Sequence, residues 1–320
     1  MVVLVVATTI DPASIGPATA LLSMPGWTPG PSFQEDMTTF VNGEVRLIQH
    51  GKSIVVEDNL DARWEQAIGE IVNEVIFLSR HTAVTNRPAL TVHPIGIPHL
   101  REGDVPPQGG KPGLAAPPSP RMGPWLLLLK KIAESHNLVP EFEVTLEATH
   151  HGPVTNVPTM FLEIGKFTLC STEDYWGRQD AAQVMALLVW EGLGMGGGAD
   201  VGNWNKKNNN KVLLGLGGGH YVPRHMDIVL KDVWVGHLIS GYSLPMEEPD
   251  QSKGKAGASS IGGTWKESIK ASYEATKTAF PGGEILAHLD QKSFKGWQKN
   301  AIIEFLGEQN IKIGKPKDFC

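Results

Sequence analysis

The sequence predicts a layered α/β fold, because apolar runs of strand length alternate along the chain with longer segments of helical pattern. Its 320 residues are 41% hydrophobic and 19% charged, which is enough apolar material for a large core. The sequence shows no internal repeat, and no linker divides it into two halves. We therefore expect one composite domain over residues 1–320.

Each expected strand is a short apolar run that ends at glycine, proline or polar residues. In chain order these strands cover residues 2–8, 45–49, 74–79, 89–93, 142–149, 159–164, 211–216, 233–238 and 284–288. The expected helices cover residues 12–23, 124–137, 173–192, 264–280 and 296–309. The helix from residue 173 has the clearest start, because Ser171 or Thr172 can cap it and acidic residues fill its first turn.

Three irregular segments interrupt this pattern, at residues 102–120, 196–210 and 247–263. They are rich in proline, glycine, asparagine, serine or lysine, and they hold too little apolar surface to order themselves. We expect each of them to be a surface loop or a lid.

Composition and apolar runs argue against several classes of protein. The apolar N-terminus lacks a basic leader and a small-residue cleavage site, so we expect a first strand there and no export. The longest other apolar runs, residues 125–129 and 181–190, fall far short of the ~20 residues that span a bilayer. Two cysteines, Cys170 and Cys320, cannot build a disulfide framework or a thiolate zinc cage. Any metal is therefore expected to bind histidine and carboxylate.

Two adjacent histidines, His150 and His151, follow the strand expected at residues 142–149 and precede Gly-Pro. Strand alternation places Glu147, Thr149 and His151 on one face and His150 on the other. Both histidines can then ligate one metal only if the backbone turns at His150. A carboxylate and a histidine on one face suit zinc or an oriented water, and the second imidazole suits acid or base catalysis. The alternative is a capped strand end with hydrogen-bonded histidines.

A run of three glycines follows the strand expected at residues 211–216: Gly217, Gly218 and Gly219. Their unobstructed backbone N–H groups can bind a phosphate or an oxyanion, beside His220. The spacing matches neither the dinucleotide fingerprint nor a Walker loop, so neither NAD nor ATP is implied. Arg224 lies just beyond, as a phosphate clamp. A purely structural tight turn is the alternative.

Two further apolar strands end in single histidines, His81 and His93. A lone histidine at a strand end is more often structural. Four strands that end in histidine in one α/β sheet are harder to dismiss, because parallel neighbours bring their carboxyl ends to one edge. We therefore expect these histidines to share a cleft, and the protein to be an enzyme.

The net charge of −6 argues against a uniformly basic nucleic-acid coat, but the charge is unevenly spread. Residues 292–318 contain six lysines and three acidic residues. Lys292, Lys295 and Lys299 alternate there with two aromatic residues, a mixture that suits nucleotide stacking and backbone neutralisation. A solvated surface, or an amphipathic helix start with a buried aromatic, is the alternative.

The motifs LSRHTA, LTVHPIG, EATHHGP with PTMFLEIG, GGGHYVPRH and KSFKGWQ occur in this order over nearly the whole chain. In this combination the chain resembles the archaeal and plant D-aminoacyl-tRNA deacylases of the second type, the plant members especially. One departure is the segment 166–170, KFTLC, because the family runs almost directly from Gly165 to Ser171. This extension lengthens a loop, alters the pocket rim or reflects an error in the gene model, and it bears on any role of Glu163.

The resemblance implies a mixed central sheet flanked by helices, with a core like that of peptidyl-tRNA hydrolase and the phosphorylases. It implies a zinc-associated hydrolase that cleaves the ester between a D-amino acid and the terminal ribose of tRNA, which is chiral proofreading. Plant relatives are also associated with removal of aldehyde-modified D-aminoacyl adducts and with tolerance of ethanol or aldehydes. The partner is then the acceptor end of D-aminoacyl-tRNA. We expect a cytoplasmic monomer, with a nuclear pool left open.

For this reaction, zinc would lower the pKa of bound water to about 7. The expected ligands are drawn from His150, His151, Glu147 and His220. The expected catalytic residues are His150, His151, Glu147, Thr149, His81 and His93. The amides of Gly218 and Gly219 would face the oxyanion, and Arg224 with the C-terminal lysines would hold tRNA phosphates.

Three rival readings stay open. Within the same activity, the ribose 2′-hydroxyl of tRNA could assist the attack while the protein only positions the substrate. The protein could instead be a metal-dependent hydrolase of small esters or amides, with irrelevant lysines. It could also be a non-catalytic tRNA-binding protein whose histidines are structural.

Overall fold

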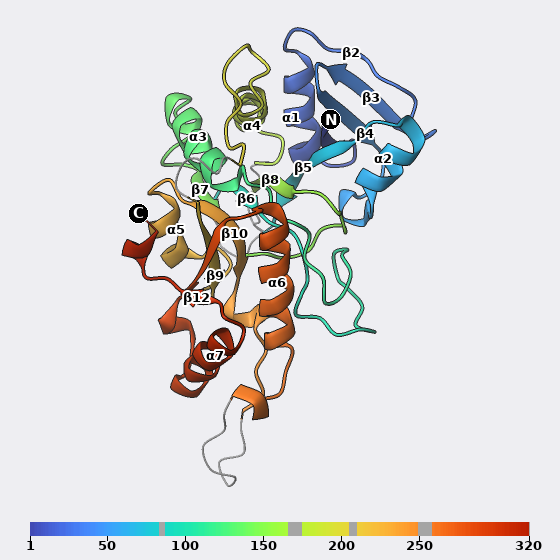
Figure 1. Cartoon of the computed structure of the whole chain (residues 1–320). Coiled ribbons are helices and arrows are strands. Elements are labelled where there is room, and N and C mark those ends of the chain that lie inside the picture. Colours follow the sequence, from blue (N-terminus) through green and yellow to red (C-terminus); the bar gives the residue numbers. More distant parts are fainter. Residues whose placement is uncertain (83–86, 166–174, 205–209, 249–257, 320) are drawn as a thin grey trace.

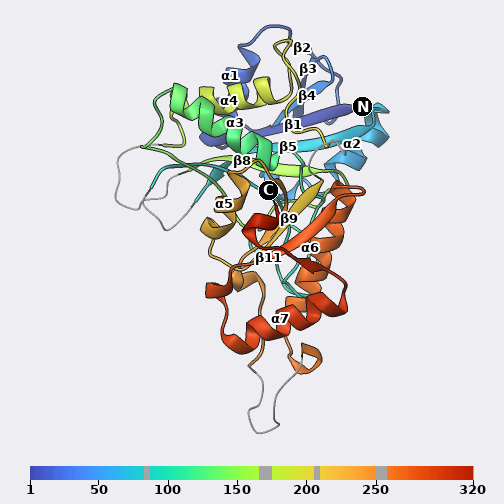
Figure 2. The same cartoon turned by 60° about the vertical axis from the view of Figure 1, so that its left-hand side comes forward.

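The computed structural model describes residues 1–82, 87–165, 175–204, 210–248 and 258–319, and these residues contain two sheets. Figures 1 and 2 show the second sheet, with α6 and α7, in the orange-to-red part of the molecule beside the first sheet. The described helices are each too short or too polar to cross a membrane.

The first sheet has eight strands in the order β2-β3-β4-β1-β5-β8-β6-β7. Strands β4, β1, β5 and β8 are parallel, β6 and β7 run the opposite way, and β2 and β3 form an antiparallel edge. The predicted mixed α/β sheet is therefore confirmed. The strands cover Val2–Thr8 (β1), Thr28–Pro29 (β2), Met37–Asn42 (β3), Val45–His50 (β4), Val72–His81 (β5), Ala89–His93 (β6), Glu143–Leu146 (β7) and Thr159–Gly165 (β8).

The second sheet is entirely parallel, in the order β10-β9-β11-β12. Its strands cover Lys211–Leu216 (β9), Trp234–Ile239 (β10), Glu284–Leu289 (β11) and Lys312–Ile313 (β12). In a parallel sheet all carboxyl ends lie at one edge, so the loops after β9, β10 and β11 come together there.

Helices cover both faces of the first sheet, and the alternation of β1 shows why. Val3 and Val5 pack in the cluster that includes the helices α1, α3 and α4, whereas Leu4 and Val6 pack with Trp64 of α2 on the other face. Figure 2 shows α1, α3 and α4 as one layer. The helices cover Pro12–Leu22 (α1), Leu60–Ile68 (α2), Met122–Ser135 (α3), Gln179–Gly192 (α4), Pro223–Val229 (α5), Trp265–Ala279 (α6) and Gly296–Glu308 (α7).

One hydrophobic cluster crosses between the sheets. Trp125 and Leu129 of α3 belong to the same buried cluster as Val235 and Leu238 of β10. The two sheets therefore share apolar packing, which is what holds the loops of one against the strand ends of the other. The single domain expected over residues 1–320 stays a prediction.

Most of the predicted elements are present, with ends shifted by a few residues. The strand expected at 142–149 is shorter, because β7 ends at Leu146. The helix expected from residue 173 begins at Gln179, and its proposed caps, Ser171 and Thr172, lie outside the described residues. Strands β2, β3 and β12 and helices α2 and α5 were not predicted, since they are short or weakly periodic. Residues 102–120 lack helices and strands, as expected of a loop.

Candidate active site

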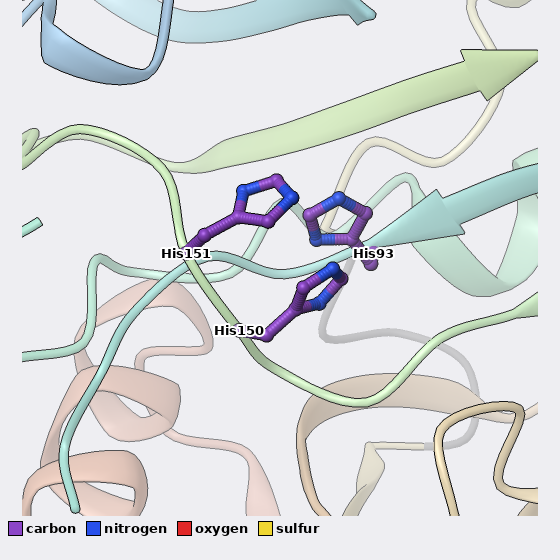
Figure 3. A group of neighbouring side chains, drawn as sticks. All are labelled: His93, His150 and His151. Atoms are coloured by element: carbon purple, nitrogen blue, oxygen red, sulfur yellow. The ribbon is translucent and has the colours of Figure 1, made fainter. Parts of the chain in front are cut away.

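Five histidines and two glutamates from the two sheets form one cluster, which we call the histidine cluster: His81, His93, Glu147, His150, His151, Glu163 and His220. Figure 3 shows three of its rings, those of His93, His150 and His151, gathered at one point between strands. The ring of His150 lies 4.2 Å from that of His93 and 4.1 Å from that of His151, centroid to centroid.

A switch from apolar to polar side chains along β5 and β8 places two members of the cluster. Phe77 pairs with Phe161 and Ser79 with Glu163, so these four side chains share one face, and alternation adds His81. The two phenylalanines belong to the core beneath α2. The polar residues that follow them therefore lie where this core ends.

The chain leaves the first sheet directly after Leu146, where β7 ends. The backbone N–H of Ala148 donates to the carbonyl of His220 at 2.8 Å, and that of Thr149 donates to the carbonyl of Leu238 at 2.6 Å. Residues 148 and 149 thus bond to the second sheet. Gly152 then adopts a φ of 94°, a conformation that favours glycine and lets the chain turn after the paired histidines.

This change of sheet makes the alternation predicted for residues 147–151 wrong. His150 Nε2 lies 3.5 Å from a Glu147 oxygen, so the two side chains that were expected on opposite faces meet. Thr149 faces away from the cluster, because its hydroxyl bonds to Nδ1 of His237 at 2.9 Å. Of the expected catalytic residues, Thr149 is the one that the structure separates from the others.

Three overlapping sets of side chains are each close enough to share a cation, and two of them hold the expected ligands, whereas the third is His93, Glu147 and Glu163. In the first set, Glu147 oxygens lie 2.9 Å from His81 Nδ1 and 2.7 Å from His220 Nε2. In the second set, nitrogens of His93, His150 and His151 all lie within 4.8 Å of one another. The four expected metal ligands are therefore together, but they are divided between two sets, and His81 and His93 complete them.

Backbone carbonyls bond to one ring nitrogen, Nδ1, of His93 and of His150. Nδ1 of His93 contacts the Pro94 carbonyl at 3.1 Å, and Nδ1 of His150 contacts the Ala148 carbonyl at 2.7 Å. A carbonyl only accepts hydrogen bonds, so Nδ1 carries the proton in both rings. In the neutral form, each ring then has a lone pair on Nε2.

In the set that contains Glu147, two tyrosine hydroxyls bond to the histidine rings. The hydroxyl of Tyr221 lies 2.9 Å from His81 Nε2, and that of Tyr242 lies 3.2 Å from His220 Nδ1. Histidines that ligate metals almost always have such a partner on the second ring nitrogen, because it fixes the ring and its tautomer.

Six buried polar atoms in the cluster make no well-aligned hydrogen bond among the described residues, although the glutamate oxygens and Nε2 of His93 each lie 2.7–3.6 Å from an oppositely charged or polar atom of the cluster. They are both oxygens of Glu147, both oxygens of Glu163, Nε2 of His93 and Nδ1 of His151. An unpaired buried polar group costs roughly 1–3 kcal/mol. A cation at the centre would pair these atoms, and imidazole with carboxylate is a donor set that zinc accepts.

Burial and mutual contact shift the pKa values of the cluster histidines. Burial disfavours charge on His81, but contacts with Glu147 and Glu163 outweigh it and raise the His81 pKa to about 11. Burial also disfavours charge on His93, but the contact with Glu163 outweighs burial and raises the His93 pKa. Burial and the nearby charge of His93 lower the pKa of His151 to about 3. Contact with the carboxylates therefore favours the charged form of His81 and His93, whereas burial favours the neutral form of His151.

A cavity of about 660 Å³ opens beside the cluster. Five of the cluster residues line it: His81, His150, His151, Glu163 and His220. The remaining lining comes from the C-terminal ends of β1 and β5 and from residues 53–55 and 107–108. The volume lies in the range of cavities that enclose a small-molecule ligand.

Two of the three amides of the glycine run are already bonded within the protein, so the oxyanion role predicted for Gly217 and Gly218 is wrong, whereas that of Gly219 stays a prediction. The amide of Gly217 donates to the Ile239 carbonyl at 2.8 Å, and the amide of Gly218 donates to Ser293 Oγ at 2.6 Å. Gly217 and Gly218 have φ of 94° and 91°, so the run is a turn that only glycine adopts readily. Its two occupied amides fix the loop that carries His220.

The predicted phosphate-binding residues lie near that loop rather than in the cavity lining. Arg224 contacts Asp290 at 3.0 Å and is half exposed. Lys292 and Lys295 are exposed beside Ser293, the residue that accepts from the glycine run, and Lys299 is partly buried on α7. Arg224, Lys292 and Lys295 therefore lie beside the loop that carries His220, and together with Lys299 on α7 we call them the basic rim.

The expectation that four histidine-tipped strands share one edge of one sheet is wrong. His220 comes from the second sheet, and β6, which carries His93, runs antiparallel to β8. The histidines still converge, because the second sheet packs its loops against the first. Segment 166–170, where the sequence departs from the family pattern, lies outside the described residues.

Sequence reasoning missed three residues of this site: Tyr221, Tyr242 and Asp11. Tyr221 had a signal, because it directly follows His220 in the motif GGGHY. Tyr242 lies in the loop after β10, and Asp11 follows β1, so each is brought in by folding alone.

Comparisons with known proteins show what the chain is similar to. A family model described as D-aminoacyl-tRNA deacylase matches residues 68–314. The D-aminoacyl-tRNA deacylase of Arabidopsis thaliana is 70% identical over 321 residues, which cover 100% of both chains. That of Hyperthermus butylicus is 35% identical over 208 residues, covering 63% of this chain and 70% of the relative. The crystal structure of AF0625, a conserved protein of unknown function, is similar with a TM-score of 0.72 at 25% identity, covering 99% of this chain and 96% of that one.

Proposed function

The chain belongs to the D-aminoacyl-tRNA deacylase family, and from this premise we propose that it hydrolyses the ester of D-aminoacyl-tRNA at the histidine cluster. The observation that carries the proposal is the position of two candidate metal-binding sets beside a cavity of about 660 Å³. An aminoacyl ester is already activated, so the protein has to bind it, position water and stabilise the charge that develops on the carbonyl oxygen.

We further propose that zinc is the cofactor. Its ligands would come from the set of His81, Glu147 and His220 and from the set of His93, His150 and His151, which leaves room for two ions. The buried nitrogens and carboxylate oxygens that lack a well-aligned hydrogen bond among the described residues support this fit. When bound there, zinc would lower the pKa of a water molecule and polarise the ester carbonyl.

The chain's own groups perform the remaining steps. His81, hydrogen-bonded to Tyr221 and in contact with two carboxylates, would keep Glu147 and Glu163 in place. Burial and neighbouring histidines hold the pKa of His150 well below its usual range, so this ring is neutral and its Nε2 lone pair is available to a cation. His150 is also partly exposed, with 19% of its side chain accessible, so a substrate can reach it.

The acceptor end of tRNA would enter over the basic rim of Arg224, Lys292, Lys295 and Lys299. The rim lies next to the loop of His220, so the terminal ribose can reach the cluster while phosphates stay on the second sheet. Activity on aldehyde-modified D-aminoacyl adducts, action as a monomer and a cytoplasmic location remain part of the proposal.

The test compares hydrolysis of D-tyrosyl-tRNA and L-tyrosyl-tRNA by the wild type, His220→Ala and His151→Ala, with zinc content measured in parallel. We expect the wild type to prefer the D-substrate, and each variant to lose at least about 100-fold in kcat together with bound zinc, since removal of a ligand removes the activated water. His136→Ala, which changes an exposed histidine at the end of α3, is the matched control and should behave as wild type.

Retained hydrolysis in both cluster variants, with no copurified zinc, would contradict the metal proposal. In that case a substrate that ends in 2′-deoxyadenosine tests the rival route, because hydrolysis that depends on the RNA hydroxyl would stop. Cleavage of small esters without competition from tRNA would instead favour a general hydrolase.

A further inference from the structure

The cavity contains a second carboxylate site that the hydrolytic chemistry does not use. Asp11 follows β1, lines the cavity together with the cluster, and is only 7% exposed. One of its oxygens accepts from the Ala13 amide at 3.1 Å as the N-cap of α1. Its other oxygen lies 3.9 Å from Arg80 Nε, and the Arg80 side chain is 54% exposed, so this pair is loose.

A row of polar side chains connects Asp11 to the cluster. Thr8 ends β1 on the same face as Val6, which pairs with Phe77, and two residues further along β5 lies Ser79. Ser79 in turn pairs with Glu163 of the cluster. Thr8 and Ser79 line the cavity, so the path from Glu163 to Asp11 is polar and buried.

The two carboxylates of the cavity lining differ in their partners. Glu163 contacts His81 at 3.4 Å and His93 at 3.6 Å, so its charge is already balanced. Asp11 is bonded by backbone amides, and its charged partner among the described residues is the guanidinium of Arg80, 3.9 Å away. A nearly buried carboxylate beside a cavity, with no close cation of its own among the described residues, is poised to bind a cationic group of a ligand.

An aminoacyl ester supplies such a group. Its α-amino nitrogen is bonded to the carbon next to the reacting carbonyl, so a carbonyl at the cluster brings the amine close by. Beside a carboxylate, an α-amino group is held as a cation at neutral pH. We infer that Asp11 binds the α-ammonium group of the aminoacyl ester and thereby orients its carbonyl toward the histidine cluster.

This inference rests on the proposed function, which supplies the aminoacyl ester. It adds a physical route to stereochemical choice. With the amine at Asp11 and the carbonyl at the cluster, the side chain and the hydrogen on the α-carbon exchange places between D- and L-isomers. One pocket shape can then reject one of them.

The test measures binding, so that it does not depend on turnover. The probe is a non-hydrolysable amide, 3′-(D-tyrosyl)amino-3′-deoxyadenosine, compared with its N-acetyl form, which has no charge on nitrogen. We expect the wild type to bind the free amine about 10- to 100-fold more tightly than the acetylated form, as for a hydrogen bond to a charged group. Asp11→Asn should bring the two dissociation constants within about threefold of each other.

The variants separate charge from the helix cap. Asparagine and serine both cap helices well, so Asp11→Asn and Asp11→Ser keep the start of α1 while removing the charge. Asp104→Asn makes the same change at an exposed aspartate outside the cavity lining and should keep the wild-type ratio. Thermal unfolding of each variant checks that the fold is intact.

Two results would overturn the inference: equal binding of both probes by the wild type, or an unchanged ratio in folded Asp11→Asn and Asp11→Ser. Failure of the proposed function looks different, because it is the absence of D-aminoacyl-tRNA hydrolysis by the wild type. The probe ratio can hold in that case, and Asp11 would then remain an amine-binding residue of a protein with another reaction.

Discussion

At the scale of single residues, the site depends on which nitrogen of each histidine is tied to an oxygen. His93 and His150 are fixed by backbone carbonyls, which no side-chain substitution can remove. His81 and His220 are fixed by hydroxyls of Tyr221 and Tyr242. The tyrosines are therefore where the orientation of a metal-binding ring can be altered without touching the ring.

Tyr242→Phe removes the hydroxyl that lies 3.2 Å from His220 Nδ1 and keeps the aromatic ring. We expect zinc affinity to fall about 10- to 100-fold, because outer partners orient the ligand and raise its basicity. Competition with a chromophoric chelator measures this directly, without an activity assay. Tyr273→Phe, a partly buried tyrosine of α6, is the control. Equal zinc affinity in Tyr242→Phe and wild type would show that this hydroxyl does not support the ligand.

At the scale of elements, the junction of β7 with β10 decides the geometry of the site. His237 of β10 lies between the two sheets, with Nε2 2.9 Å from the Ala116 carbonyl and Nδ1 2.9 Å from the Thr149 hydroxyl. The carbonyl requires a proton on Nε2, so Nδ1 of the neutral ring accepts from Thr149. This bond helps to hold the chain at residue 149 against the second sheet and therefore supports the paired histidines.

The same junction makes stability depend on pH. Burial lowers the pKa of His237 to about 4, whereas an unfolded histidine titrates near 6.5. Between these values the unfolded chain binds a proton that the folded one does not, so this contribution is complete above pH ~6.5 and is lost as pH falls toward about 4. The slope from one such group is about 1.4 kcal/mol per pH unit.

Urea unfolding of the wild type and His237→Asn between pH 7.5 and 5 measures this contribution. We expect the variant to be less stable at pH 7.5 but to lose stability less steeply on acidification, by about 1.4 kcal/mol per pH unit below pH 6. His136→Asn, at an exposed position, should keep the wild-type slope. Parallel slopes for His237→Asn and wild type would mean that His237 is protonated alike in both states.

Local patterns predicted the strands well and the site incompletely, and β7 shows the reason. Alternation from Phe142 is regular, and nothing in the sequence marks Leu146 as the last strand residue. The strand ends there because Ala148 and Thr149 find hydrogen-bond partners on the second sheet, which are distant in sequence. The residue types of the cluster were therefore predictable, whereas the faces and the division into two sets required the fold.

At the scale of the whole molecule, two sheets replace the single sheet that the alternating pattern suggested. Sequence periodicity identifies strands but does not say which strands pair, and within the described part of the chain β9 to β12 pair with each other and not with the first sheet. Each sheet therefore supplies a different part of the site. The first sheet supplies most of the cluster and Asp11, and the second supplies His220, the tyrosines and the basic rim.

The basic rim is the feature that reconciles a net charge of −6 with a polyanionic substrate. Exposed lysines bind phosphate by displacing condensed counterions, so each contact contributes about 0.7–0.9 to the slope of log affinity against log salt. Lys292→Gln and Lys295→Gln should each lower the slope for tRNA binding by about this amount while leaving kcat on a bound substrate close to wild type. Lys295 also contacts Glu248 at 3.9 Å, an exposed pair that competes only weakly with a phosphate.

The control is Lys130→Gln on α3, because that helix covers the face of the first sheet opposite α2 and carries an exposed lysine of the same kind. Titrating tRNA at several salt concentrations gives the slope for each protein. If the Lys292 and Lys295 variants keep the wild-type slope while Lys130→Gln lowers it, the tRNA approaches over the helical layer rather than over the second sheet. The acceptor end would then have to reach the cavity from the side of β1 and β5, past Asp11.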